Sequence, residues 1–506
     1  MKNIQMLTAV VGLLFTACVF GEGVTLPDAE RIVLDNGTVL IINEKHDVPL
    51  IGLTAIVRGG AAVDPEGKHG LANLLANVME KGAGERSALQ FAETAAGVGG
   101  ELSASAGLEA ISVSATFMSD DAALMVELVS DMLQRPTLDR KEFNKLRERS
   151  INFIKAAKGS DPGELMSAYA NAFLFGAHPY GNPASGSEAS LSNIKHSDLL
   201  EYYAKMIGGD RLIISVSGDF EASAMRESLT AAFGAWRPAS EPLPSVDAPT
   251  KAAGGSVYLI DKPGATQTYF YIGNVGVARS FPQRAELDLA NTVFGGRFTS
   301  MLVTELRTKS GLSYDARSML TRYAQPGAMF ISSFTETGTT VAALDVALST
   351  LAQLRSDGLD AAMVDSARNY VMGQFPPRLE TAGQLANTFA TLEANGLDAS
   401  YINDYGASLA AATPESIAAV INSVYPPAEE LVFIVIGDAA LIREQLGAYG
   451  SITEVSLSAL SFHPSVRRNS EVVFTGLRYL PIQNSENIRP RRSSDDTAPV
   501  IFPSAC

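Results

Sequence analysis

The chain has 506 residues, of which 46% are hydrophobic and 19% charged, and its formal net charge is −16. This length exceeds what one hydrophobic core serves, so we expect two or more domains. The acidic balance argues against nucleic-acid binding, because no basic stripe is present to displace counterions from phosphates. An acidic surface mainly favours solubility and suits basic partners.

The first 20 residues predict an export signal. Their apolar run, from Met6 to Phe15, is too short to span a bilayer comfortably. Small residues before Cys18 resemble a bacterial lipoprotein cleavage box, in which Cys18 is the lipidated residue; ordinary cleavage near Ala17 or Gly21 is the alternative. We therefore expect an exported protein, located in the bacterial periplasm or anchored to the membrane as a lipoprotein.

Strand and helix patterns follow this signal. Arg31 to Leu34 and Thr38 to Ile42 flank Asp35-Asn36-Gly37, which is a hairpin signal. Further strands are predicted at Ile51 to Val57, Glu101 to Ala106, Ala110 to Met118 and Leu212 to Ser217, and helices at Ala88 to Ala96, Asp121 to Arg135 and Arg140 to Lys158.

Between the early strands, Gly70 to Glu80 predicts an amphipathic helix with one apolar stripe. Asn73 and Asn77 are four residues apart and share another face of this helix. Two metal ligands with a general base between them would need this spacing. An Asn amide is a poor zinc ligand, however, and Ala76 between them has no proton to give or take.

The second part of the chain repeats the first. Leu212 to Asp219 and Leu431 to Asp438 are both strands that close on Gly-Asp, and they lie 219 residues apart between matching helices. This period predicts two copies of one α+β unit. A Pro-rich stretch, Arg237 to Pro249, separates them. Later strands are predicted at Val257 to Ile260, Thr268 to Val275 and Ala328 to Phe334, and helices at Arg284 to Phe294, Thr299 to Thr308, Thr340 to Ser356, Ala361 to Gly373 and Ala382 to Asn395.

Gly70-Leu71-Ala72, the apolar helix and Glu80-Lys81-Gly82 resemble the first motif of the pitrilysin–insulinase family of zinc peptidases. In that family the helix carries His-x-x-Glu-His. The resemblance implies that the two His positions fall on Asn73 and Asn77, and that the catalytic Glu falls on Ala76.

The family's third metal ligand is a Glu about 76 residues further on. The matching segment, Ile151 to Ile154, has no carboxylate, and Glu148 lies about a turn and a half away on a solvated helix face. His69 could bind a metal, but no second strong ligand follows it at i+4. We therefore expect no metal in this chain, with Asn73, Ala76 and Asn77 as degenerate positions.

A second motif is retained. Gly295-Gly296-Arg297-Phe298-Thr299-Ser300 and Gly311-Leu312-Ser313-Tyr314 resemble the segment in which the family's peptidases carry an Arg and a Tyr seven residues apart, reaching toward the metal site. These residues match Arg307 and Tyr314. Peptide hydrolysis builds an oxyanion, which a pre-aimed cation and a phenol can hold. The structural alternative is a solvated Arg and a Tyr in the sheet.

The resemblance covers roughly Glu30 to Phe462 and implies an α+β fold of two homologous domains, each a mostly antiparallel sheet backed by helices. The predicted first domain is 28–238, the linker 239–252, the second domain 253–462, and 463–506 a disordered tail. Cys18 and Cys506 are the only cysteines, so no disulfide framework is expected.

The turn and strand around Gly99, Gly100, Leu102, Ser103 and Ala104 resemble the family's substrate-pairing edge. An open edge can accept a peptide as an additional strand through main-chain hydrogen bonds. A plain hairpin is the alternative.

A chain with the Arg/Tyr pair and no metal motif resembles the zinc-free subunit of heterodimeric bacterial members. This implies a subunit of an exported zinc metalloendopeptidase that binds peptide and contributes Arg307 and Tyr314 in trans, with zinc held by a paralogous partner. On its own it would not be a peptidase. Two alternatives stay open: a binding or structural protein of the same fold, and a self-sufficient peptidase with an unrecognised site.

Overall fold

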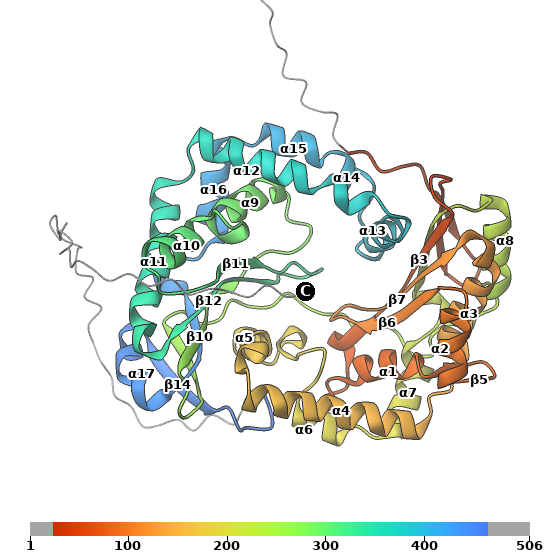
Figure 1. The fold of residues 1–506 in the computed structure, drawn as a ribbon, viewed down its shortest axis with the longest axis horizontal. Coiled ribbons are helices and arrows are strands. Elements are labelled where there is room, and N and C mark those ends of the chain that lie inside the picture. The colour runs from red at the N-terminus through yellow and green to blue at the C-terminus, as the bar shows by residue number, and fades with distance from the viewer. Residues whose placement is uncertain (1–23, 464–506) are drawn as a thin grey trace, which may run out of the picture. The chain divides into compact units, whose positions relative to one another are not determined.

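The computed structural model describes residues 24–463. The expected export signal, Cys18, Cys506 and the expected tail from residue 464 onward lie outside these residues. The described chain forms two six-stranded sheets, each backed by helices (Figure 1). This confirms the α+β fold with two sheet-containing domains; the predicted domain boundaries remain predictions. Among the described helices, none has the length and hydropathy needed to cross a membrane.

The first sheet belongs to residues 24–238, called the first half below. Its strand order is β1-β2-β8-β3-β7-β6, so β6 forms one edge. Only β2 and β8 run parallel; the other neighbours are antiparallel. The strands are β1 (Glu30–Val33), β2 (Val39–Glu44), β3 (Leu50–Arg58), β6 (Glu101–Ala106), β7 (Ala110–Met118) and β8 (Leu212–Gly218), and a separate ribbon pairs β4 (Gly82–Ala83) with β5 (Arg86–Ser87).

The second sheet belongs to residues 253–463, called the second half. Its order is β11-β12-β10-β13-β9-β14. Strands β13 and β14 both run parallel to β9, and the remaining pairs are antiparallel. The strands are β9 (Ser256–Asp261), β10 (Gln267–Val275), β11 (Ala316–Leu320), β12 (Ala328–Glu336), β13 (Val432–Gly437) and β14 (Ser451–Ser456).

The two sheets repeat one topology. Strands β2, β8, β3, β7 and β6 correspond in order and direction to β9, β13, β10, β12 and β11. The repeated Gly-Asp strands are β8 and β13, which hold the same place in their sheets. The outermost strands differ, since β1 is antiparallel to its neighbour and β14 is parallel. The 219-residue period therefore does reflect a duplicated unit.

The helices agree with the predicted ranges except around the second motif. There, α9 ends at Asn291 and continues as a π-helical turn, Thr292–Gly296, and α10 continues as a second π-helical turn, Thr304–Lys309. Strands β11 and β14 were not expected from the sequence.

The helices of the first half are α1 (Leu71–Met79), α2 (Ala88–Ala96), α3 (Ala122–Gln134), α4 (Arg140–Gly159), α5 (Met166–Phe175), α6 (Glu188–Asn193), α7 (His196–Met206) and α8 (Ala222–Phe233). Those of the second half are α9 (Arg284–Asn291), α10 (Met301–Val303), α11 (Thr340–Asp357), α12 (Ala361–Gln374), α13 (Ala382–Ala394), α14 (Ser400–Asn403), α15 (Tyr405–Ala411), α16 (Pro414–Val424) and α17 (Ala439–Leu446).

One helix of each half packs on the sheet of the other half. Helix α13 lies against β3 and β8 (Figure 1). Its Leu385 and Phe389 form a core with Ile41 and Ile213 of the first sheet. Helix α5 lies against β10 and β13. Its Phe173 ring stacks on a second-sheet ring, that of Tyr258, with the ring centroids 4.2 Å apart.

This exchange is reciprocal. A shift of 219 residues carries α5 onto residues 385–394, which lie inside α13. The approach of α13 to the first sheet is close, since a Cβ at Gly52 of β3 would overlap the backbone of Gly383. Each half therefore completes its core with a helix supplied by the other.

Candidate functional site

The helix that resembles the metal-binding helix is held at its start by a buried carboxylate. Asp64 accepts hydrogen bonds from the backbone N–H groups of Gly70, Leu71 and Ala72, at 2.8, 3.1 and 2.9 Å. Burial raises the pKa of the Asp64 carboxyl to about 7, although the three N–H donors act in the opposite direction. Sequence reasoning missed Asp64, because it precedes the helix by more than a turn and the N-cap position itself is Gly70, with φ of 100°.

The two Asn residues at the expected His positions bind each other. Asn77 Nδ2 donates to Asn73 Oδ1 at 2.9 Å and to the Asn73 carbonyl at 2.8 Å. Ala76, at the position of the family's catalytic Glu, is fully buried. A zinc ion does not fit this arrangement, because amides are poor zinc ligands and the two already bind one another.

The remaining metal candidates do not gather into a site. Asn152, Phe153 and Glu148 are exposed on α4. His69 lies near His463, and burial lowers its pKa. Within residues 24–463, no group of three or more His, Cys, Asp or Glu side chains is arranged to hold a metal ion.

Of the expected substrate-pairing residues, Gly99 and Gly100 form the turn before β6, and Leu102, Ser103 and Ala104 lie in β6, an edge strand of the first sheet. Gly99 has a φ of 70°, and a Cβ at Gly100 would overlap the Phe117 ring, so the turn needs both glycines. The Ala104 N–H donates to Glu80 Oε1 at 2.7 Å. One main-chain donor of the edge is therefore already occupied by the residue that follows α1, a contact that the sequence analysis did not foresee.

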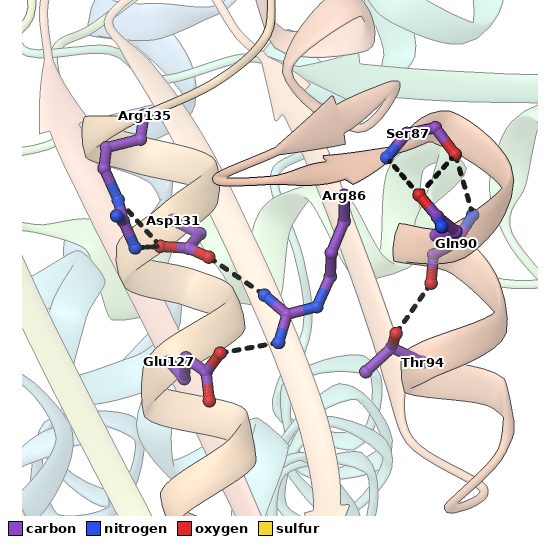
Figure 2. A network of polar contacts seen from close by, with 7 residues as sticks. All are labelled: Arg86, Ser87, Gln90, Thr94, Glu127, Asp131 and Arg135. Carbon is purple, nitrogen blue, oxygen red and sulfur yellow. Dashed lines mark hydrogen bonds and ion pairs between the residues drawn. The ribbon is translucent and has the colours of Figure 1, made fainter.

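A polar network anchors α2, the helix that leads into this turn (Figure 2). The Asp131 carboxylate of α3 is almost fully buried and accepts from Arg135 and from Arg86, whose Nη1 lies 3.1 Å from Asp131 Oδ2. Ser87 and Gln90 form a capping box at the start of α2. Because Arg86 and Ser87 are adjacent in β5, the network fixes the position of α2 relative to α3.

The second motif brings its predicted residues together. The Arg307 Cζ lies 4.3 Å from the centroid of the Tyr314 ring. It also lies 4.9 Å from the ring of Phe298, a residue of the same motif whose role could not be predicted from the sequence. The rings of Phe298 and Tyr314 are 70% and 71% exposed. Arg307 is thus a cation between two exposed aromatic rings, below called the Arg307 stack (Phe298, Arg307 and Tyr314).

Local backbone geometry produces this contact. Arg307 lies in the π-helical turn, and the chain then reverses at Gly311, with φ of 65°. The N–H groups of Leu312 and Ser313 both donate to the Leu306 carbonyl, at 2.9 and 3.0 Å. This turn returns the chain beside the helix, so the Arg307 guanidinium lies over the ring of Tyr314, seven residues further on.

The Arg307 guanidinium keeps its hydrogen-bonding capacity. Across the described part of the chain, no side-chain hydrogen bond or ion pair engages it. The nearby acid Glu305 instead accepts from Lys309 Nζ at 2.7 Å. The stack can therefore present a fixed cation with free N–H donors to a carbonyl or carboxylate oxygen.

Comparison with known families gives two adjacent matches. Residues 38–186 match the family described as "Insulinase (Peptidase family M16)", and residues 193–371 match the one described as "Peptidase M16 inactive domain". Together these matches span both motifs and most of the two sheets.

Relatives carry both kinds of description. An "Uncharacterized zinc protease" of Streptomyces coelicolor is 26% identical over 361 residues, which cover 70% of this chain and 78% of that protein. The "Non-peptidase homolog YmxG" of Helicobacter pylori is 24% identical over 360 residues, covering 69% and 80%.

Solved structures show the same fold. A peptidase M16 inactive domain protein from Pseudomonas fluorescens superposes with a TM-score of 0.76 at 21% identity, covering 81% of this chain and 98% of that one. A protease from Helicobacter pylori gives a TM-score of 0.77 at 18% identity, covering 81% and 100%.

Proposed function

The chain belongs to the peptidase M16 family, also called the insulinase family, and on that premise we propose that it is the zinc-free subunit of an exported heterodimeric zinc peptidase. In this proposal a paralogous partner subunit holds the zinc. This chain binds the peptide substrate and contributes Arg307 and Tyr314 in trans. The likeness of residues 193–371 to an inactive domain, and the relative described as a non-peptidase homologue, support a role without autonomous peptidase activity.

The observation that carries the proposal is the contrast between the two motifs. The first motif has lost its ligands, and Asn73 and Asn77 bind each other. The second motif leaves Arg307 without a polar partner in the described residues, between two exposed rings. A free, oriented cation on an exposed surface suits a ligand or substrate supplied from outside this chain.

The residues of this chain would act by positioning and charge. The Arg307 guanidinium stays protonated at any working pH and can donate two parallel N–H bonds to a substrate oxygen. The Tyr314 hydroxyl can donate a further hydrogen bond. Aimed at the carbonyl oxygen that becomes negative during hydrolysis, such donors stabilise the transition state more than the ground state. We assign no metal chemistry to this chain.

The test is reconstitution. The chain is co-expressed with a paralogue that carries the zinc-binding His-x-x-Glu-His motif, the complex is purified, and cleavage of a peptide library is measured. Arg307→Ala and Tyr314→Phe should each lower the cleavage rate, the first by about a hundredfold or more, as removal of an oxyanion donor does. Arg317→Ala is the matched control, because Arg317 is an exposed neighbour on β11 that pairs with Asp315. Unchanged rates in both variants would refute the proposal.

A second candidate function is a peptide- or protein-binding or structural role without proteolysis. It is favoured by the contact between Glu80 and Ala104, because a carboxylate there competes with an incoming peptide strand. A stable complex with the paralogue that cleaves no peptide of the library would support this candidate.

A further inference from the structure

Phe298 is a large apolar side chain on the surface of the second half. It is 70% exposed, so its burial adds little to stability. It follows Gly296 and Arg297 in the loop before α10, whose first turn is capped by Ser300. Its one described ring contact is with the Arg307 guanidinium, at 4.9 Å.

The arrangement of the two rings around the cation is informative. Phe298 and Tyr314 both lie within 5 Å of the Arg307 Cζ, yet among the described residues they make no ring contact with each other. Two rings this close to one atom but apart from each other must approach it from different sides. The guanidinium is thus restrained on two sides, while its N–H groups remain free of intramolecular partners.

Aromatic rings restrain a cation in a way that a carboxylate cannot. An acid beside Arg307 would use the N–H donors and neutralise the charge, as Glu305 does for Lys309. A ring attracts the same cation through its face and leaves the in-plane donors unused. A long Arg side chain otherwise loses rotamer freedom when it binds, which weakens binding.

We propose that Phe298 is a positioning residue for Arg307, a role that rests on the proposed function of the Arg307 stack. Its ring holds the guanidinium against Tyr314 before substrate arrives. Removing the ring should leave the fold intact and lower kcat/KM for peptide cleavage by the heterodimer about two- to fivefold, the size expected for one exposed cation–π contact. Phe298→Leu is the variant that keeps an apolar side chain and removes the ring.

The first measurement needs no partner subunit. The full chain is labelled with ¹⁵N-arginine, and the Arg307 side-chain Nε–H resonance is assigned by its loss in Arg307→Lys. In the wild type this resonance should carry an upfield ring-current shift from both rings. Phe298→Leu should lose part of that shift with an unchanged melting temperature, and Phe298→Tyr, which keeps a ring, should restore it. If the Arg307 resonance of Phe298→Leu stays at its wild-type position, the proposal is overturned, whatever the activity of the complex.

The second measurement uses the reconstituted complex and separates the two proposals. A loss of rate in Phe298→Leu that Phe298→Tyr largely recovers, and that disappears when Arg307 is already Ala, supports the positioning role. If Arg307→Ala abolishes cleavage while Phe298→Leu does not change it, the positioning role is wrong and the proposed function stands. If Arg307→Ala itself has no effect, both are wrong.

Discussion

The two halves of the chain share five strands in the same order and directions. The hydrogen bonding of the polar side chains at their motifs differs. In the first half, Asn73 pairs with Asn77, and Glu80 takes the N–H of Ala104. In the second half, the Arg307 guanidinium lies over two aromatic rings and, within residues 24–463, has no side-chain hydrogen bond or ion pair. The duplicated scaffold thus carries one motif whose polar groups bind one another and another whose cation has no polar partner among the described residues.

One contact, between the end of a strand and the start of a helix, is the same in both halves. Glu44, at the end of β2, accepts from the Ala222 N–H at the start of α8, at 2.7 Å. Its counterpart Asp261, at the end of β9, accepts from the Ala439 N–H at the start of α17, at 3.0 Å. Carboxylates at helix N-termini are stabilising. This carboxylate contact is therefore present in both halves, unlike the polar contacts at the motifs.

The largest effect should come from separating an exchanged helix from its sheet. Gly52→Val puts a side chain into the Gly383 backbone, which cannot move without displacing α13, and should lower the free energy of unfolding by about 3 kcal/mol. Gly163→Val, just before α5, meets mainly the Tyr269 ring, which can rotate, and should be less damaging. Both are measured by urea unfolding of the full chain.

Gly338→Ala is the control for these two variants, since its new Cβ would enter open space. Equal losses for Gly52→Val and Gly163→Val would contradict the view that α13 approaches its sheet more closely than α5 does.

The next effect concerns the start of α1. Asp64 is ionised above about pH 4 when unfolded but keeps its proton up to about pH 7 when folded, so its contribution to stability falls as pH rises between those values and is constant above them. Asp64→Asn should flatten that fall and cost about 1–2 kcal/mol in lost hydrogen bonds near pH 4. Stability is measured by denaturant unfolding across this range.

The second half supplies the control for this titration, because α9 begins after Gln283 without a side-chain capping bond. Gln283→Ala should leave the pH slope unchanged. If the free energy of unfolding has the same pH slope in Asp64→Asn and in the wild type, Asp64 is not the group that causes the slope.

A smaller, local effect is expected at the β6 edge. Glu80→Ala should speed hydrogen exchange of the Ala104 amide about tenfold or more, since a hydrogen bond to a charged group is lost. Ser318, at the equivalent register position on β11, should exchange as before. Glu101→Ala, an exposed change on the same strand, is the control. An unchanged Ala104 rate would mean that Glu80 does not hold the edge in solution.

The smallest expected effect is a change in the pKa of one exposed histidine, His46, without a change in fold. His46 lies 2.6 Å from Asp219 and 2.9 Å from Glu44, and these contacts raise its pKa to about 8. The stabilisation is complete below the unfolded pKa of 6.5 and is lost as pH rises through about 8. By NMR, Asp219→Asn should lower the His46 pKa, whereas Asp438→Asn, the second-half counterpart, should not. An equal response to both changes would exclude Asp219 as the cause.

Much of the fold could be predicted from the sequence, because its signals are local or periodic. The alternating apolar strands and the Gly-Asp repeat identified both copies of the unit. Strands β11 and β14 were missed, because their sequences mix polar and apolar residues without a clear alternation. The exchange of α5 and α13 could not be predicted, since an apolar helix face does not reveal which sheet covers it.

Some residues of the candidate site could be predicted from the sequence and others could not. Arg307 and Tyr314 were predicted from motif context, and the structure brings them together across a seven-residue turn. Asp64, Glu80 and Phe298 were not predicted. Each acts through a partner that only the folded chain brings near: a helix start, a strand edge and a guanidinium.

The reciprocal helices have a consequence for how the protein is made. Synthesis proceeds from the N-terminus, so the face of the first sheet around Ile41 and Ile213 stays bare until residue 394 has emerged. A gene cut between the halves would yield two fragments, each with one sheet uncovered and one apolar helix unmatched. Such fragments should aggregate or reassociate rather than persist alone.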